Sequence, residues 1–249
     1  MNTPVFPADS GANSTAADLE HAMLAQANPV DAEILMRFFK TGPGQYGEGD
    51  KFLGIKNPKT RRTAKAFRDL PIGEAVRSAQ SLWHEIRLCS LMILANRYQS
   101  KKTSEAERAD IFERYADLAR RGFVNNWDLV DLTAPDIAGA YAFEHGIGTL
   151  KRFAASGHLW EERIAVLAMF PFIRAGQLEI PFRMVDRFLA HPHDLMHKAC
   201  GWMLREIGKR DCAALTDYLL KNKAGMSRTT LRYAIERFSE EDRKAFLAR

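Results

Sequence analysis

Apolar residues recur with a helical period from about residue 17 to the C-terminus, and this pattern limits the possible folds more than any other feature of the chain. Alternating β-branched runs joined by hairpin turns, the usual sign of strands, are not convincing anywhere. Short linkers separate predicted helices of about 10 to 17 residues. The pattern therefore predicts an all-α protein.

Two segments of the chain resemble each other, which favours a repeat architecture. Residues 81–94 (SLWHEIRLCSLMIL) and 158–171 (HLWEERIAVLAMFP) share a Leu-Trp pair, an acid, an arginine and a dense apolar stripe. Trp83 and Trp160 are 77 positions apart (160 − 83). Two units of about 38 residues fit this distance, slightly below the period of HEAT repeats. We therefore predict a curved α-solenoid of HEAT-like helical hairpins, each stacked on its neighbours.

The beginning of the chain differs from the rest. Residues 1–16 contain proline and serine and lack a helical pattern, so we expect a flexible N-terminal tail followed by a single domain over 17–249. The first eighteen residues contain no Lys or Arg and no apolar core, and no run of about 18 apolar residues occurs later. Neither a signal peptide nor a membrane span is expected, which favours a cytoplasmic protein.

Cys89, Cys200 and Cys212 are widely spaced and lie in apolar helical patterns. We interpret them as small core residues or free thiols, because neither a disulfide framework nor a zinc motif has this spacing.

Positive charge is concentrated in one segment. The net charge is only +5, but seven cations and no acid occur between residues 51 and 68. They are Lys51, Lys56, Lys59, Arg61, Arg62, Lys65 and Arg68. Pro58 suits the first turn of a helix here. Two interpretations are open: a solvated basic helix, or a contact with a phosphate backbone.

Two short motifs match known sites only formally. Gly42, Gly44 and Gly47 have dinucleotide-fingerprint spacing, but they follow a helical pattern where that fingerprint needs a strand, so we predict a flexible loop. His193 and His197 are four apart, as in a zinc helix, but Asp194 is the only acid between them and no third ligand is evident. We expect a helix start there and no metal.

Polar and aromatic residues share helix faces at two places. In NNWDLVDL (125–132), Trp127 and Asp131 are four apart and so point the same way, whereas Asp128 is turned about 100° from Trp127. Lys198, Trp202 and Arg205 also share one face. For each tryptophan the alternative is a buried core aromatic.

Four segments, taken in order, resemble the DNA alkylation repair glycosylases of the AlkD type. They are YGEGDKFLGIKNPKTRR (46–62), WDLVD (127–131), LWEERIAVLAMF (159–170) and KACGWMLREIGK (198–209). The resemblance spans about residues 31–248. It implies a solenoid whose concave basic face holds duplex DNA, and hydrolysis of the N-glycosidic bond of N3- and N7-alkylated purines such as 3-methyladenine and 7-methylguanine. An abasic site would remain, and no cofactor is implied.

The resemblance also implies roles for individual residues. The catalytic carboxylate falls on Asp131, and aromatic residues that line the lesion site fall on Trp127 and Trp202. An arginine that steadies the nearby DNA backbone falls on Arg163. Phe38 stands where the family has a tyrosine, so a contact through that hydroxyl is in doubt. Further DNA contacts are expected from Lys51, Lys56, Lys59, Arg61, Arg62, Lys198 and Arg205.

These residue types suit the chemistry. An alkylated purine is cationic and already a good leaving group, so the barrier lies in the oxocarbenium character of the sugar. A carboxylate such as Asp131 stabilises that cation and orients water, as in glycosidases. Aromatic faces add about 0.5 to 2 kcal/mol of attraction each.

Two alternatives from other classes stay open. One is a non-catalytic HEAT-like protein that binds damaged or branched DNA, and the other is a protein-binding scaffold. The basic segment counts against the scaffold. We expect a monomer with duplex DNA containing alkylated purines as its partner and no obligate protein partner.

Overall fold

The computed structural model describes residues 13–248, which divide into two compact units: unit 1 up to residue 137 and unit 2 from residue 138. Within the described range the regular elements are helices, and the β-structure is limited to an isolated bridge between Lys51 and Trp83. Residues 1–12 of the expected tail lie outside the described part. The single domain over 17–249 stays a prediction.

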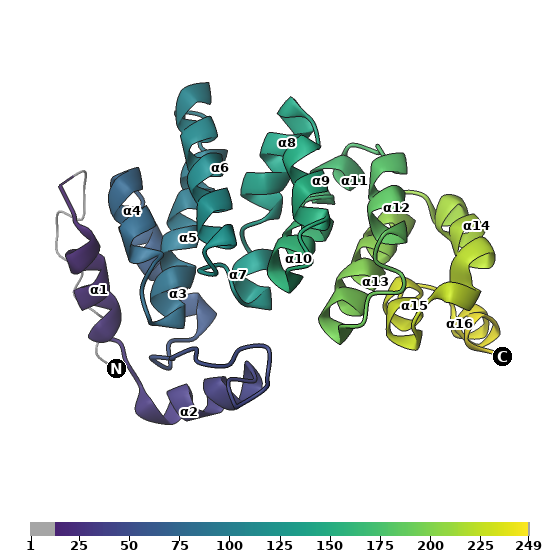
Figure 1. The fold of residues 1–249 in the computed structure, drawn as a ribbon, viewed down its shortest axis with the longest axis horizontal. Helices are drawn as coiled ribbons and strands as arrows, with labels where there is room; N and C mark the ends of the chain where they lie inside the picture. Colours follow the sequence, from purple (N-terminus) through teal and green to yellow (C-terminus); the bar gives the residue numbers. More distant parts are fainter. Residues whose placement is uncertain (1–12, 249) are drawn as a thin grey trace. The chain divides into compact units, whose positions relative to one another are not determined.

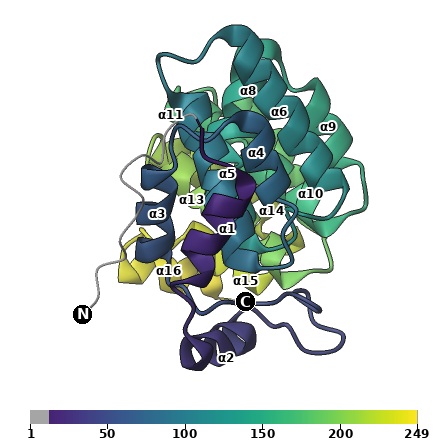
Figure 2. The same cartoon turned by 90° about the vertical axis from the view of Figure 1, so that its left-hand side faces the viewer.

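Helices of unit 1 form two rows (Figure 1). Their bounds are α1 (Ala16–Leu24), α2 (Pro29–Phe38), α3 (Asn57–Ala66), α4 (Ile72–Ser78), α5 (His84–Gln99), α6 (Glu105–Arg120) and α7 (Trp127–Asp131). In one row α4 packs against α1 and α6, and in the other α5 packs against α3 and α7. The α2 helix and the loop after it lie beside these rows rather than within them (Figure 2). Stacked helix pairs confirm the predicted all-α solenoid class.

Unit 2 is built in the same manner around α13. Its helices are α8 (Ala140–His145), α9 (Gly148–Ala154), α10 (Leu159–Leu167), α11 (Phe170–Arg174), α12 (Glu179–Asp186), α13 (Asp194–Gly208), α14 (Cys212–Asn222), the 3₁₀ turn η2 (Lys223–Gly225), α15 (Arg228–Ala234) and α16 (Glu240–Leu247). The α13 helix contacts α10, α12, α14 and α15. The chain enters this unit through a π-helical turn, η1 (Pro135–Gly139).

Local sequence explains where many helices begin. Thr15 and Ser104 form reciprocal capping boxes at α1 and α6, and Asn28 caps α2 in front of Pro29. The α5 helix is different: 13 of its 16 residues are buried. A helix that is apolar on nearly every side belongs in the interior, so α5 is the core of unit 1.

One helix predicted from periodicity is two helices in the structure. The sequence predicts a continuous helix over 160–174, but α10 ends at Leu167 and α11 begins at Phe170. Pro171 explains the break, because proline lacks a backbone N–H and is tolerated only in the first turn of a helix. The predicted helix over 135–145 likewise begins as the π-helical turn η1.

The three thiols are free. Cys89 and Cys200 are buried, as predicted for core residues, whereas Cys212 is exposed. Burial raises the pKa of the Cys200 thiol to about 12, so this group is not a reactive thiolate. Among residues 13–248 no helix combines the length and hydropathy needed to cross a membrane.

Gly201 tests the packing of α13 on α15. A Cβ at this position would lie 2.5 Å from Tyr233 Cβ and 2.6 Å from the Thr230 carbonyl oxygen. Replacing Gly201 with alanine should therefore lower the unfolding free energy by about 1 to 3 kcal/mol in urea denaturation. The matched change Gly73→Ala, in α4 with open space around it, should raise it by about 0.5 to 1 kcal/mol. Equal effects of the two changes would contradict the close packing.

Candidate functional site

The two acids of WDLVD have different environments in α7. Asp128 is 1% exposed, whereas Asp131 is partly exposed at the last position of the helix. Asn126 caps the helix through a hydrogen bond from the Trp127 N–H at 2.9 Å. The structure thus turns one acid inward and leaves the other partly exposed.

Asp128 is held by His84, the first residue of α5. The His84 Nε2 atom lies 2.9 Å from Asp128 Oδ2, and its Nδ1 atom lies 3.1 Å from Asp50 Oδ2. All three side chains are buried. A neutral imidazole has a single N–H, so it donates to both carboxylates only when it is protonated.

The electrostatics of His84 agree with a buried imidazolium. Burial alone would lower its pKa, but the charge of Asp128 and the hydrogen bonds with both carboxylates outweigh burial and raise the pKa to about 9. For Asp50, burial favours the neutral acid, yet the His84 hydrogen bond and the Arg87 charge hold its pKa at about 2. His84 is therefore protonated and Asp50 is ionised at neutral pH.

Arg87 and two asparagines complete this buried ion network. Arg87 Nη2 donates to Asp50 Oδ1 at 2.6 Å and to Asn125 Oδ1 at 3.0 Å. Asn125 Nδ2 donates to Asp50 Oδ1 at 3.0 Å, and Asn126 Nδ2 donates to Asp50 Oδ2 at 3.5 Å. The network joins the start of α5, the loop before α3 and the residues that begin α7, so it determines where α7 lies.

A cluster of four rings connects His84 with Trp127, and within it Phe39 also lies 5.0 Å from His84. Phe52 stacks on His84 with centroids 4.4 Å apart, Phe39 stacks on Phe52 at 5.0 Å, and Trp127 stacks on Phe39 at 5.2 Å. Phe38 lies edge-on to Trp127 at 6.0 Å and is 60% exposed. Phe38 and Trp127, which the resemblance assigned to one site, are therefore neighbours.

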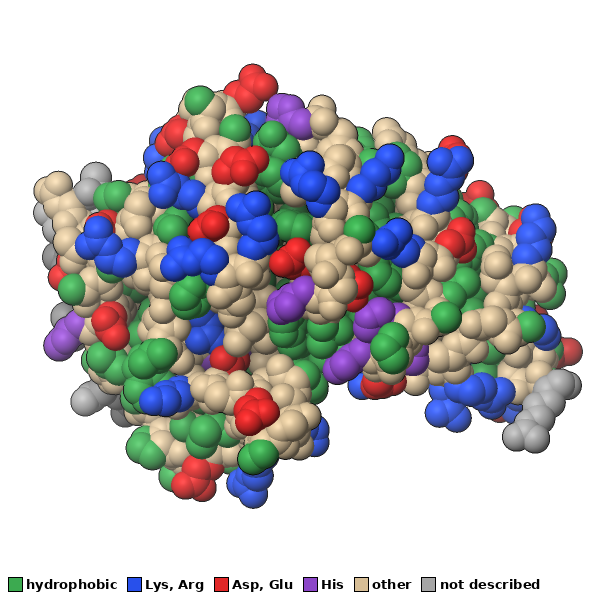
Figure 3. Space-filling view, in the orientation of Figure 1, with side chains coloured by type: hydrophobic (Ala, Val, Ile, Leu, Met, Phe, Trp, Pro, Cys, Tyr) green, Lys and Arg blue, Asp and Glu red, His purple; other side chains and the backbone are tan. Residues whose placement is uncertain are grey.

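The α2 helix carries an apolar surface that ends at Phe38. Val30 and Ile34 are 71% and 50% exposed and precede Phe38 at intervals of four residues. Figure 3 shows hydrophobic side chains at the surface over α2. Side chains four apart lie on one helix face, so an apolar ridge leads to the Phe38–Trp127 pair.

Glu85 fixes the loop that carries Phe52. Its carboxylate accepts hydrogen bonds from the N–H groups of Leu53, Gly54 and Ile55 at 2.8 to 3.0 Å. Gly54 has φ +82°, and a Cβ there would lie 2.0 Å from the Asn28 carbonyl oxygen. Only glycine fits this position. The GxGxxG segment upstream follows α2 rather than a strand, as expected for a loop.

The predicted DNA-contact cations of unit 1 are exposed but not equivalent. Lys56 forms an ion pair with Asp31 at 3.1 Å. The Lys51 carbonyl oxygen accepts a hydrogen bond from the His84 N–H, so Lys51 lies next to the buried ion network. Arg61 turns into a hollow beside α5. The exposed candidates for DNA contact in unit 1 are Lys51, Lys56, Lys59, Arg61 and Arg62.

The unit 2 candidates lie on or beside α13. Trp202 is partly buried, packs edge-on against Phe170 at 5.2 Å, and donates through Nε1 to Glu206 at 3.1 Å. Lys198 pairs with Asp194 at 2.8 Å, and Arg205 pairs with Glu236. These two cations are thus neutralised by neighbouring acids, and their contact with DNA stays a prediction.

Arg163 is buried, with 4% of its surface exposed. It donates a hydrogen bond to the Leu195 carbonyl oxygen in the first turn of α13. The observed contact is therefore internal and positions the helix that carries Trp202. The contact of Arg163 with a DNA backbone stays a prediction.

Two histidines form contacts in the loop before α13. His193 caps the helix by accepting from the Leu195 N–H at 3.1 Å, and His191 lies 3.0 Å from Glu162. Burial lowers the pKa of His193, which keeps its ring neutral and able to accept. Within the described part of the chain no group of three or more His, Cys, Asp or Glu is arranged to hold a metal.

Sequence reasoning missed the buried ion network. Asp50, His84, Arg87 and Asn125 were not candidates, and Phe39 and Phe52 were not associated with Trp127. One signal was present: residues 84–87 read HEIR at the start of an otherwise apolar stripe. Three ionisable residues on a helix that is buried all round require partners.

Comparisons with known proteins show the family to which the chain belongs. The family model described as "DNA alkylation repair enzyme" matches residues 19–238, so the chain belongs to the family of DNA alkylation repair enzymes. A solved structure described as a predicted DNA alkylation repair enzyme from Enterococcus faecalis has 15% sequence identity and a TM-score of 0.66, over 86% of this chain and 97% of the other. At that identity it shows the fold alone. No curated protein matches the chain.

The pKa of His84 predicts a pH dependence of stability. Its value of about 9 in the folded state exceeds the ordinary 6.5, so the contribution of His84 is complete below pH 6.5 and is lost as pH rises through 9. Thermal and urea unfolding of the wild type should lose on the order of 3 kcal/mol between pH 6.5 and 9.5.

The variant His84→Gln should be less stable at pH 6.5 and should lack most of this alkaline loss. His158→Gln, at an exposed position, is the matched control and should follow the wild type. An unchanged pH profile in His84→Gln would contradict a buried imidazolium.

Proposed function

We propose that this protein is a DNA glycosylase that hydrolyses the N-glycosidic bond of N3- and N7-alkylated purines in duplex DNA. Its family membership supports a role in the repair of alkylated DNA. The observation that carries the finer proposal is the asymmetry of α7, where Asp128 is committed to His84 and Asp131 is accessible one turn after the stacked indole of Trp127.

Asp131 has a setting that suits stabilisation of a developing cation. It is partly exposed, and its charge contributes, after burial, to raising the pKa of the interior Tyr115 hydroxyl. This effect places a negative field at the C-terminal end of α7. A fixed carboxylate beside the sugar lowers the energy of an oxocarbenium-like transition state and orients the attacking water.

The aromatic residues supply the surface that receives the lesion. Trp127 has one face covered by Phe39 and its edge beside the exposed Phe38. An electron-rich ring attracts the cationic purine, and the attraction grows when water is excluded. Trp202 in unit 2 is proposed as the second aromatic, positioned by Arg163 through the start of α13.

The buried ion network is proposed to position the catalytic helix. Asp131 is in the same five-residue helix as Asp128, and the capping Asn126 is also buried. A helix this short has little stability of its own, so tertiary contacts hold it in place. His84 is therefore a positioning residue, which acts on the chemistry through α7.

Substitution of Asp131 tests the proposed chemistry. Asp131→Asn should reduce the single-turnover rate of 7-methylguanine and 3-methyladenine release from methylated duplex by at least about 100-fold, since an amide cannot stabilise the cation. Affinity for the duplex should change little. The readout is the released base, or alkali-sensitive breaks in methylated plasmid.

Asp110→Asn is the matched control, because Asp110 is an exposed acid of α6 paired with Arg114. It should retain the wild-type rate. Release by Asp131→Asn at the control rate would exclude Asp131 as the catalytic group. Tight, salt-sensitive binding by the wild type without release of any alkylated base would instead support the non-catalytic DNA-binding alternative.

A further inference from the structure

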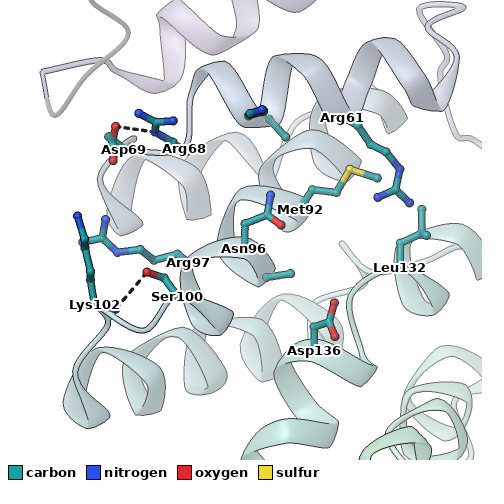
Figure 4. A pocket seen from close by; sticks show the side chains of 13 residues that line it. Arg61, Arg68, Asp69, Met92, Asn96, Arg97, Ser100, Lys102, Leu132 and Asp136 are labelled. Atoms are coloured by element: carbon teal, nitrogen blue, oxygen red, sulfur yellow. Dashed lines mark hydrogen bonds and ion pairs between the residues drawn. The ribbon is translucent and has the colours of Figure 1, made fainter.

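A hollow of about 660 Å³ lies within unit 1, next to the candidate site. Its walls come from α3, the second half of α5, the turn after α5 and the residues that follow α7 (Figure 4). Its size falls in the range of about 300 to 1,000 Å³ typical of ligand sites. The proposed reaction does not use this hollow.

The walls of this basic hollow carry five cations. Arg61 and Lys65 project from α3 and Arg68 from the turn after it, and Arg97 and Lys102 come from the opposite side. Two carboxylates, Asp69 and Asp136, also line it, so positive charge predominates. An anion is the ligand that this balance favours.

The five cations differ in how far they are neutralised. Arg68 lies 3.3 Å from Asp69, and Arg97 lies 3.1 Å from Glu107. Lys65 and Lys102 are exposed and form no ion pair within residues 13–248, and the same holds for Arg61. The hollow is lined by five cations and only two carboxylates, so a bound anion is attracted by the excess positive charge.

The position of these cations indicates an extended ligand. Figure 4 shows Arg61 and Leu132 at one end of the hollow and Arg68, Arg97 and Lys102 at the other. Charges at both ends suit successive phosphates better than one phosphate. Leu132 directly follows Asp131 in the chain, so one end of the hollow is adjacent to the proposed catalytic carboxylate.

We propose that the basic hollow binds successive phosphates of the DNA strand that flanks the lesion. The proposal rests on the proposed action on DNA and adds Lys65, Arg68, Arg97 and Lys102 to its contacts. It also divides the basic segment 51–68 into two groups. The strand in the hollow contacts Arg61, Lys65 and Arg68, whereas Lys59 and Arg62 lie outside the hollow. Such contacts position the strand and do not read its sequence.

The test compares two double variants that lose the same charge. Lys65→Gln with Lys102→Gln removes two ammonium groups from the hollow, and Lys101→Gln with Lys221→Gln removes two exposed ones that do not line it, Lys101 being the sequence neighbour of Lys102. Binding of an unmodified duplex is measured by fluorescence anisotropy between 50 and 200 mM salt. The hollow variant should bind on the order of tenfold more weakly, and its slope of log K against log salt should be shallower by about 1.8.

The controls keep this result separate from catalysis and folding. Unmodified duplex is used, so a lack of base release would overturn the proposed function but leave this measurement valid. Lys65→Arg with Lys102→Arg keeps the charge and should restore the wild-type slope. Equal slopes for the hollow variant and the Lys101/Lys221 variant would overturn the proposal.

Competition distinguishes a strand from a free anion. Inorganic phosphate and dAMP are added to the preformed complex at constant ionic strength. Neither should displace the duplex at micromolar concentrations, because each supplies one phosphate group. Displacement by either compound, lost in the Lys65/Lys102 double variant, would show a site for a small anion and overturn the proposed strand contact.

Discussion

The buried imidazolium of His84, held between Asp50 and Asp128, is the interaction on which unit 1 depends. Ion burial is costly unless each charge has a partner, and here two carboxylates face His84 and Arg87, so the charges balance. Removal of one member of the network leaves a buried charge without a partner. The resulting loss of stability is far larger than the net stabilisation that the intact pair provides. The network therefore selects one arrangement of the loop before α3, the start of α5 and the start of α7.

A related arrangement gives physical meaning to the similarity between residues 81–94 and 158–171. Glu85 and Glu162 are 77 positions apart, each two residues after the tryptophan of a Leu-Trp pair, and both are buried near the beginning of a helix. Glu85 accepts three loop N–H groups, and Glu162 lies 3.0 Å from His191 in the loop before α13. In each unit a carboxylate at a helix start holds a neighbouring loop. The weak repeat in the sequence thus reflects a repeated structural task.

Periodicity predicted the helical class well, because each helix leaves its own local pattern of apolar residues and caps. It failed at Pro171, where a local backbone constraint interrupts an apolar stripe that continues on both sides. The shared face of Trp127 and Asp131, with Asp128 turned about 100° from Trp127, was predictable, since it follows from helical geometry within one short segment. The partners of His84 were not, because they lie 34 and 44 residues away and no local rule links them. The burial of Arg163 was unpredictable for the same reason: its partner, Leu195, belongs to another helix.

The ring cluster fixes how the indole of Trp127 meets any ligand. Trp127 is stacked on Phe39, which is stacked on Phe52, so the indole has lost its rotational freedom when the chain has folded. Ordering a side chain during association normally weakens binding by roughly 0.5 to 1.5 kcal/mol. Trp127 is already ordered before a ligand binds, so this loss of binding free energy does not apply to it. Its ring is fixed in place before a ligand binds and does not adjust to adducts of different shape. Discrimination among adducts must therefore come from steric exclusion by this ring and from the space left beside it.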